Sequence, residues 1–317
     1  MTGLRVIHAG ARATVQDSGR RGYRKHGLSA GGALDIHSYH WANKLLDNPT
    51  NCACVEILLG GFEAEAQTDM VIAVAGAATS IRINDAPRDG WQSIQLRKGD
   101  VIAIAPTRTG RVTYLATPGG FDTATWFGSR SVVVREQIEG IEPIGPGDLL
   151  APTKSNAGFI PRRVPGRFQG NYSERLTLRL IPSAQYSLFR RDDLLRLTTS
   201  IYRVGNQSDR MGYRLEGPAL EQVPPGIISE GIPTGSVQIP GDGKPIVLLN
   251  DCQTIGGYPK PGTLGALDAG RLAQRLPGQE LEFCFAEVAD IQNERVVFHR
   301  FFSKSRWHED GMDLSWR

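Results

Sequence analysis

Glycine and proline interrupt this chain so often that long helices are not expected. The 317 residues include 37 glycines and 19 prolines, and both residue types break helices and mark turns. Between Val55 and Thr117, short apolar segments such as MVIAVA and VIAIA alternate with turn sequences such as Lys98-Gly99-Asp100. Short strands at regular spacing are typical of a closed antiparallel β-barrel or a β-sandwich. The pattern therefore predicts a mainly β fold.

One helix is expected in this first block. Asp35 can cap a segment whose apolar residues between Ile36 and Leu46 fall on one face, and Asn48-Pro49 ends it.

A second block begins near Leu176, after a segment from Pro161 to Gly170 that is rich in Pro, Gly and Arg and is interpreted as a linker. It contains the strand LTLRLI, a helix from Asp192 to Thr199, further short strands and a helix from Leu264 to Arg275. Each block thus combines short strands with a helix, which indicates two similar barrels in tandem. The expected parts are an N-terminal barrel, a C-terminal barrel and a tail, over residues 1–160, 171–292 and 293–317.

Charge and composition exclude several classes of protein. The net charge is only +3, which favours neither nucleic acid nor an anionic membrane as a partner. The four cysteines are too scattered for a disulfide framework and are expected to be reduced. No signal peptide is recognisable, and the longest apolar stretch, Met70 to Ala78, is too short to span a membrane. A cytoplasmic protein is expected.

Three clusters of polar residues beside glycines are candidate binding loops, because backbone can approach a ligand closely there. The first runs from Gln16 to Gly22 and includes Asp17 and Arg20. Its Asp17-Ser18-Gly19 sequence is equally typical of a β-turn.

The second cluster is SDRMGYRL, in which Arg210 and Arg214 lie four residues apart. On an extended chain both guanidinium groups project to one face and could clamp an anion. A salt bridge from either arginine to a neighbouring acid explains the pattern equally well.

The third cluster has the most polar groups. Gln238 precedes an apolar strand, which leads into the loop NDCQTIGGYPK. The loop carries the acid Asp251, the amide Gln253, the hydroxyl Thr254 and the phenol Tyr258. These groups are typical of an active-site rim, with Asp251 as either a general base or a turn-capping carboxylate.

Several motifs are missing. The sequence contains no phosphate-binding loop, no dinucleotide-binding glycine motif and no zinc-protease or serine-hydrolase motif. His37 and His40 lie three residues apart but have no evident carboxylate or cysteine companion, so no metal is predicted. No lysine is flanked by methionine as in a biotin carrier, so any ATP or biotin is expected to be handled by another chain.

The segments VQDSGRRGY, SAGGALD, SDRMGYRLEGP, GSVQIPGDGKPIVLLNDCQTIGGYP and LAQRLPGQELEF, together with the helix around Asn43, closely resemble one family. It is the biotin-dependent carboxyltransferase-like family, also called KipA or the second-subunit family of allophanate hydrolase. The resemblance spans about residues 4–290. It implies two tandem cyclophilin-like β-barrel domains, with the active site in the cleft between them.

Within this family, single chains of this length resemble the C subunit of the ATP-dependent 5-oxoprolinase, a lactam hydrolase. That resemblance implies two partner proteins, one like the B subunit (KipI-like) and one like the A subunit. It also implies the conversion of 5-oxo-L-proline, ATP and water to L-glutamate, ADP and phosphate. ATP with Mg²⁺ is expected to bind with or on a partner, and biotin is not expected. The chain alone is expected to be inactive.

For this reaction we assign roles by residue chemistry. Asp251 would accept the lactam N–H, and Arg210 and Arg214 would clamp an anion. Further hydrogen bonds to substrate would come from neutral side chains, namely Asn43, Gln238, Gln253, Thr254 and Tyr258. Asp17 and Arg20 would close the rim.

Two alternatives stay open. In a biotin-dependent carboxylase the same positions would serve carboxyl transfer from carboxybiotin to a urea or guanidine nitrogen, with Asp251 taking the proton. A KipA-like regulatory protein, which antagonises a kinase inhibitor, would need only its partner interface. Ile255 stands where the family often has a small or hydroxyl residue, and Lys260 and Pro261 extend the loop in a way that the sequence does not explain, so substrate choice could shift at these positions.

Overall fold

The computed structural model describes residues 2–78, 80–154 and 158–303, and these form two compact units. Among the described residues, unit 1 comprises 2–20, 31–172 and 297–303, and unit 2 comprises Arg21–Ala30 and Ser173–Val296. A short early segment therefore belongs with the C-terminal half of the chain. Of the expected tail, residues 304–317 lie outside the described residues.

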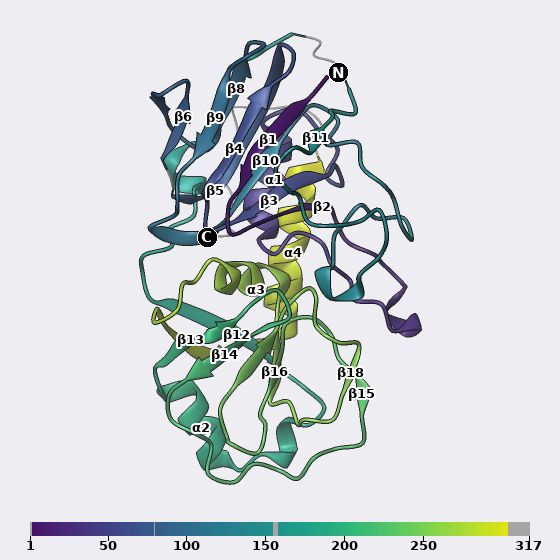
Figure 1. The fold of residues 1–317 in the computed structure, drawn as a ribbon. Helices are drawn as coiled ribbons and strands as arrows, with labels where there is room; N and C mark the ends of the chain where they lie inside the picture. Colours follow the sequence, from purple (N-terminus) through teal and green to yellow (C-terminus); the bar gives the residue numbers. More distant parts are fainter. Residues whose placement is uncertain (1, 79, 155–157, 304–317) are drawn as a thin grey trace. The chain divides into compact units, whose positions relative to one another are not determined.

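Unit 1 is built from two sheets of short strands around one core (Figure 1). The six-stranded sheet has the order β11-β1-β4-β9-β6-β7 and consists of β1 (Leu4–Ala9), β4 (Phe62–Ala66), β6 (Ile81–Ile83), β7 (Ala86–Arg88), β9 (Val101–Ile104) and β11 (Leu149–Leu150). The five-stranded sheet has the order β2-β3-β10-β5-β8 and consists of β2 (Arg12–Gln16), β3 (Cys54–Leu58), β5 (Met70–Ala78), β8 (Gln92–Leu96) and β10 (Thr109–Ala116). Phe62 from the first sheet and Ile72 and Leu115 from the second belong to the same buried cluster.

The helix α1 (Ile36–Lys44) forms where the sequence predicts it. The Asp35 side chain accepts hydrogen bonds from the backbone N–H groups of His37 and Ser38, which satisfies two of the donors that a helix start leaves unpaired. The helix packs on β5 and β10.

A buried hydrogen-bond network holds the start of α1 on the second sheet. The Tyr114 hydroxyl donates to Glu56 Oε2 at 2.6 Å and accepts from the Asp35 backbone N–H at 2.9 Å. Glu56 Oε2 also accepts from the Leu34 backbone N–H at 2.9 Å. Burial, followed by the nearby Glu56 charge, raises the pKa of Tyr114 well above its usual value. The network gives a buried carboxylate the hydrogen bonds that buried charges require.

The segment from Pro161 to Gly170, which we interpreted as a linker, instead packs into unit 1. Val164 and Phe168 are buried, and the Phe168 ring lies 5.8 Å from that of Trp41. The backbone N–H of Ser93 donates to the Arg162 carbonyl at 2.9 Å. Val164 and Phe168 are its only buried side chains and backbone hydrogen bonds hold the rest, which is why the segment shows no apolar period.

Unit 2 contains a closed seven-stranded barrel in the order β12-β19-β16-β17-β14-β13-β20 (Figure 1). Its strands are β12 (Leu176–Pro182), β13 (Tyr202–Ser208), β14 (Gly212–Glu216), β16 (Ser236–Gln238), β17 (Ile246–Leu248), β19 (Gly262–Leu264) and β20 (Glu280–Phe285). Six pairs in the barrel are antiparallel, and β12 and β20 pair in parallel. The expected mainly β fold is thus confirmed, with a closed barrel in unit 2 and two sheets in unit 1.

Three helices accompany the barrel strands in sequence, namely α2 (Arg191–Thr199), α3 (Ala266–Ala273) and α4 (Val288–Ser303). Arg179 on β12 donates to Asp268 Oδ2 at 2.7 Å and to Glu294 Oε2 at 2.5 Å, so it ties α3 and the first part of α4 to the barrel. Burial raises the pKa of Asp268, and Arg179 opposes that shift. From Val297 onward α4 belongs to unit 1, where Phe302 stacks on His40.

We expect Tyr114→Phe to destabilise unit 1 by about 1–3 kcal/mol, because it removes a donor from the buried Glu56 carboxylate and an acceptor from the Asp35 N–H. The described tryptophans, Trp41, Trp91 and Trp126, all lie in unit 1, so tryptophan fluorescence during urea unfolding reports on this unit. An unchanged unfolding midpoint would mean that the network contributes nothing to stability.

Candidate functional site

Residues 21–30 are fastened to the third polar loop of the sequence. They contain a single 3-10 turn, Arg24–His26, which ends at Gly27 with a φ of +83°. The Arg24 Nη2 atom donates to the carbonyl oxygens of Ile232 and Gln253, the latter at 3.0 Å. The Ser29 hydroxyl donates to the carbonyl of Cys252 at 3.0 Å. An early segment thereby satisfies backbone acceptors of a loop more than 200 residues later.

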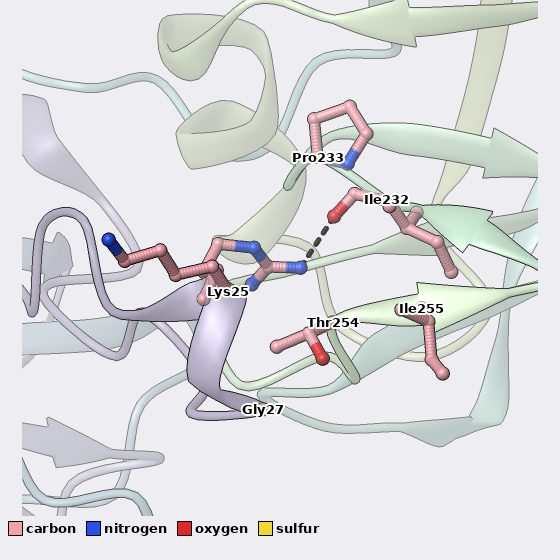
Figure 2. A pocket seen from close by; sticks show the side chains of 8 residues that line it. Lys25, Gly27, Ile232, Pro233, Thr254 and Ile255 are labelled. Carbon is pink, nitrogen blue, oxygen red and sulfur yellow. Dashed lines mark hydrogen bonds between the residues drawn. The ribbon is translucent and has the colours of Figure 1, made fainter.

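A pocket with a cavity volume of about 580 Å³ opens beside these contacts within unit 2. It is lined by Arg24, Lys25, Gly27, Gly231, Ile232, Pro233, Thr254 and Ile255. Figure 2 shows Lys25 and Gly27 on one side of it and Ile232, Pro233, Thr254 and Ile255 on the other, with the hydrogen bond to the Ile232 carbonyl between them. Its size falls in the range of small-molecule sites.

A two-stranded ribbon carries part of this lining. It consists of β15 (Glu230–Gly231) and β18 (Ile255–Gly256), which pair antiparallel. A Cβ on Gly256 would lie 2.3 Å from Ile232 Cδ1 and 3.1 Å from Gln238 Nε2, and a Cβ on Gly257 would lie 2.8 Å from the Ile227 carbonyl oxygen. The two glycines therefore allow the ribbon to lie directly against the residues beneath it.

The ribbon is also held by a charged contact. Lys260, which is 3% exposed, donates from Nζ to Glu230 Oε1 at 2.7 Å, and Gln185 Nε2 donates to the same oxygen. The hydrogen bond from Lys260 lowers the pKa of Glu230. Lys260, which the sequence left uninterpreted, thus anchors the ribbon.

Arg210 and Asp251 form a buried bidentate ion pair. Arg210 Nε donates to Asp251 Oδ2 and Nη2 donates to Oδ1, both at 2.8 Å, and the Asp251 backbone N–H donates to the Arg210 carbonyl at 2.9 Å. The two residues are 2% and 4% exposed. Arg214 pairs with Asp242 at 3.0 Å near the surface. The sequence allowed either an anion clamp or salt bridges to neighbouring acids, and in the structure both arginines form salt bridges.

Gln253, Thr254 and Tyr258 are placed differently. Gln253 and Thr254 are half-buried and Tyr258 is exposed, and none of these side chains makes a hydrogen bond to another residue in the described ranges. Thr254 lines the pocket.

Gln238 lies on β16 and is 2% exposed. Its Nε2 atom is buried beneath Gly256 without a hydrogen-bond partner in the part of the chain that the structure describes. An unsatisfied buried donor is rare and is often explained by a ligand or a water.

The predicted residues of unit 1 are engaged in internal contacts. Asp17 Oδ1 accepts from the hydroxyls of Ser129 and Ser131, each at 2.6 Å, and from the Gly19 N–H, as in the turn that the sequence suggested. Arg20 is 1% exposed and pairs with Glu136 at 3.3 Å.

Asn43 is likewise buried. Its Nδ2 atom donates to the carbonyl of Cys52 at 3.1 Å, and its Oδ1 atom accepts from Asn48 at 2.9 Å. Its amide therefore already has partners that hold the end of α1.

Sequence reasoning missed Arg24 and Lys25. The signal was the basic run RRGYRKHG, which begins inside the first cluster at Arg20 and continues beyond its end, and only its beginning entered the prediction.

Burial raises the pKa of the Cys252 thiol, and the nearby Arg24 opposes that shift.

No group of three or more His, Cys, Asp or Glu residues in the described ranges is arranged to hold a metal ion. Among these same residues, no helix is both long enough and apolar enough to cross a membrane.

Comparison with known proteins gives a consistent result. Residues 26–285 match the family described as "Carboxyltransferase domain, subdomain A and B". The chain is 34% identical to the C subunit of 5-oxoprolinase from Escherichia coli strain K12, over 96% of this chain and 98% of that protein. It is 35% identical to the C subunit of 5-oxoprolinase from Haemophilus influenzae, over 92% of this chain and 95% of that protein.

Among solved structures, the urea amidolyase of K. lactis matches with a TM-score of 0.89 and 22% identity. The match covers 96% of this chain but only 20% of the amidolyase, so the chain spans about a fifth of that protein. At this identity the likeness concerns the fold alone.

We expect Arg210→Met to destabilise unit 2 by about 3–5 kcal/mol, because it leaves the Asp251 carboxylate buried without its cation. The double variant Arg210→Met/Asp251→Asn should cost less than the two single variants together, since the stranded charge is gone. Urea unfolding followed by far-UV circular dichroism measures all three. Strict additivity would contradict an energetically coupled pair.

Proposed function

Because the chain belongs to the family of the carboxyltransferase domain, subdomain A and B, we propose that it is the C subunit of an ATP-dependent 5-oxoprolinase. The observation that carries this proposal is the 34% identity to the C subunit of a 5-oxoprolinase along almost the full length of both chains. Urea amidolyase shares the fold at lower identity and is a much longer protein.

The chemical problem of this reaction is the stability of the lactam. An unstrained amide is a poor electrophile. Transfer of the γ-phosphoryl group of ATP to the lactam oxygen releases ADP and turns that oxygen into a leaving group. Water then adds to the ring carbon and the C–N bond breaks, with the nitrogen leaving as the amine, so the ring opens to an acyl phosphate. A second water attacks this acyl carbon, phosphate leaves, and L-glutamate is formed. Such chemistry requires positioning of the lactam and stabilisation of charge on its oxygen.

In this proposal the chain contributes the lactam-binding part of the assembly. Gln253 and Tyr258 supply hydrogen bonds to the reacting amide, since their side chains make none with other described residues. Thr254 and Gln238 add donors at the pocket and beneath the ribbon.

The other predicted site residues have two kinds of role in this proposal: one contacts the substrate, and the others hold the site in place. Asp251 keeps a lone pair on each oxygen for a substrate N–H, while Arg210 holds its carboxylate in place. The remaining three residues hold the backbone of unit 1 in place through their hydrogen bonds and do not contact the substrate, namely Asn43, Asp17 and Arg20.

Other chains complete the enzyme. ATP and Mg²⁺ bind with or on a partner like the A subunit or the B subunit (KipI-like), because the sequence has no phosphate-binding loop of its own. The chain alone is inactive, and the assembled enzyme works in the cytoplasm.

The test is to co-express this chain with the A-like and B-like proteins of its own genome and to measure glutamate formed from 5-oxoproline. We expect glutamate only with ATP present and only when all three chains are present.

Two other outcomes would contradict the proposal. Folded and associated chains that form no glutamate but carboxylate a urea-like amide with biotin would indicate the carboxyltransferase alternative. An assembly without either activity, in which this chain only relieves kinase inhibition by the KipI-like protein, would indicate a regulatory protein. The variant Tyr258→Phe tests the enzyme proposal within the assembly. It removes the hydroxyl proposed to bind the reacting amide, so turnover should fall while assembly stays intact.

A further inference from the structure

The pocket of unit 2 has an uneven distribution of charge. Two cationic side chains, Arg24 and Lys25, line it, and its lining includes no acidic residue. The nearest acid along the chain, Glu230, is paired with Lys260. The lining therefore favours an anionic ligand.

The two cations have unused hydrogen-bonding capacity. Arg24 donates through Nη2 to two carbonyl groups, which fixes the plane of its guanidinium group. Its Nη1 atom is buried and has no hydrogen-bond partner within the described part of the chain, so a ligand that reached it would satisfy this donor. Lys25 is exposed and likewise forms no hydrogen bond or ion pair with the residues the structure describes. A rigid guanidinium beside a flexible ammonium suits a carboxylate.

The rest of the lining is apolar or neutral. Ile232, Pro233 and Ile255 supply hydrocarbon surface, and Thr254 supplies a hydroxyl. A polyphosphate has no apolar surface to bury against these residues. A compact ring with methylene groups would bury them there, so a carboxylate on a small apolar ring fits the lining better than a nucleotide phosphate does.

We propose that this pocket is the carboxylate subsite for the substrate, with Arg24 and Lys25 as the cations that bind it and Ile255 as the residue that packs on the ring. The inference rests on the proposed function, and it assigns the carboxylate of the lactam substrate to this pocket. It assigns the anion-binding role expected of Arg210 and Arg214 to Arg24 and Lys25, because the former pair with Asp251 and Asp242.

This arrangement places recognition and reaction on one loop. Thr254 lines the pocket and belongs to the loop that also carries Gln253 and Tyr258, so a ring held by its carboxylate would lie beside the Thr254 hydroxyl. Binding of the carboxylate then orients the amide for reaction.

The test compares variants in the assembled three-chain enzyme. We expect Arg24→Gln to raise the KM for 5-oxoproline about 10- to 100-fold, and Lys25→Gln, which breaks no contact with described residues, to raise it about two- to fivefold. The KM for ATP should stay unchanged. Lys244→Gln removes a lysine of unit 2 that does not line the pocket and serves as the matched control. A rise in the KM for ATP instead would identify a phosphate site and overturn the proposal.

A second ligand isolates the carboxylate. 2-Pyrrolidinone has the same lactam ring without the carboxyl group and is used as a competitive inhibitor of 5-oxoproline turnover. Lys25→Gln should leave the inhibition constant of 2-pyrrolidinone unchanged. Equal losses of affinity for both compounds would overturn the proposal.

Equilibrium binding of radiolabelled 5-oxoproline, measured without ATP, separates this inference from the proposed function. Binding that weakens in Lys25→Gln supports the subsite even if the wild-type assembly releases no glutamate. Binding that is absent, or unchanged in both variants, overturns the subsite even if turnover is normal.

Discussion

The buried pair between Arg210 and Asp251 is the contact on which the site in unit 2 depends. It joins the beginning of the SDRMGYRL cluster to the start of the loop that carries Gln253, Thr254 and Tyr258. A charge in the interior must be paired and hydrogen-bonded, and two parallel hydrogen bonds fix how the guanidinium and the carboxylate face each other. The loop beyond Asp251 therefore begins from a fixed point. The Arg24 and Ser29 contacts then fix the backbone that follows, so side chains without partners among the described residues are presented from a rigid frame.

The polar residues predicted for the site fall into two groups: those whose side chains form hydrogen bonds within the protein, and those whose side chains form none with the described residues. Asp17, Arg20 and Asn43 hold turns and helix ends in unit 1, and their hydrogen-bonding capacity is directed to the protein itself. The side chains of the second group form no hydrogen bond with the described residues, and they belong to Gln253, Thr254 and Tyr258. A polar residue beside glycines can belong to either group, because a turn and a binding loop use the same residue types. Only the partners of each side chain distinguish the two.

The same distinction explains what could be predicted from the sequence. The mainly β fold and the helix capped by Asp35 follow from local patterns, since short apolar segments separated by turns and a capping carboxylate are visible in neighbouring residues. The pairing of Arg210 with Asp251 is not visible, because it joins residues that no local period relates. The same holds for Arg24, whose partner carbonyl on Gln253 lies 229 residues further on. The segment from Pro161 to Gly170 lacks any period and yet packs, because two buried side chains and backbone hydrogen bonds to Trp91 and Ser93 hold it.

The membership of residues 21–30 in unit 2 has a consequence for how the chain can be divided. These residues are synthesised early, but the carbonyl groups that Arg24 and Ser29 satisfy are synthesised late, so unit 2 is complete only when nearly the whole chain exists. Contacts of such long sequence separation close late in folding, because the loop entropy must be paid first. A fragment that starts at Ser173 would contain the entire barrel and still lack both donors. Unit 2 is therefore a structural unit that no contiguous stretch of its own sequence can supply.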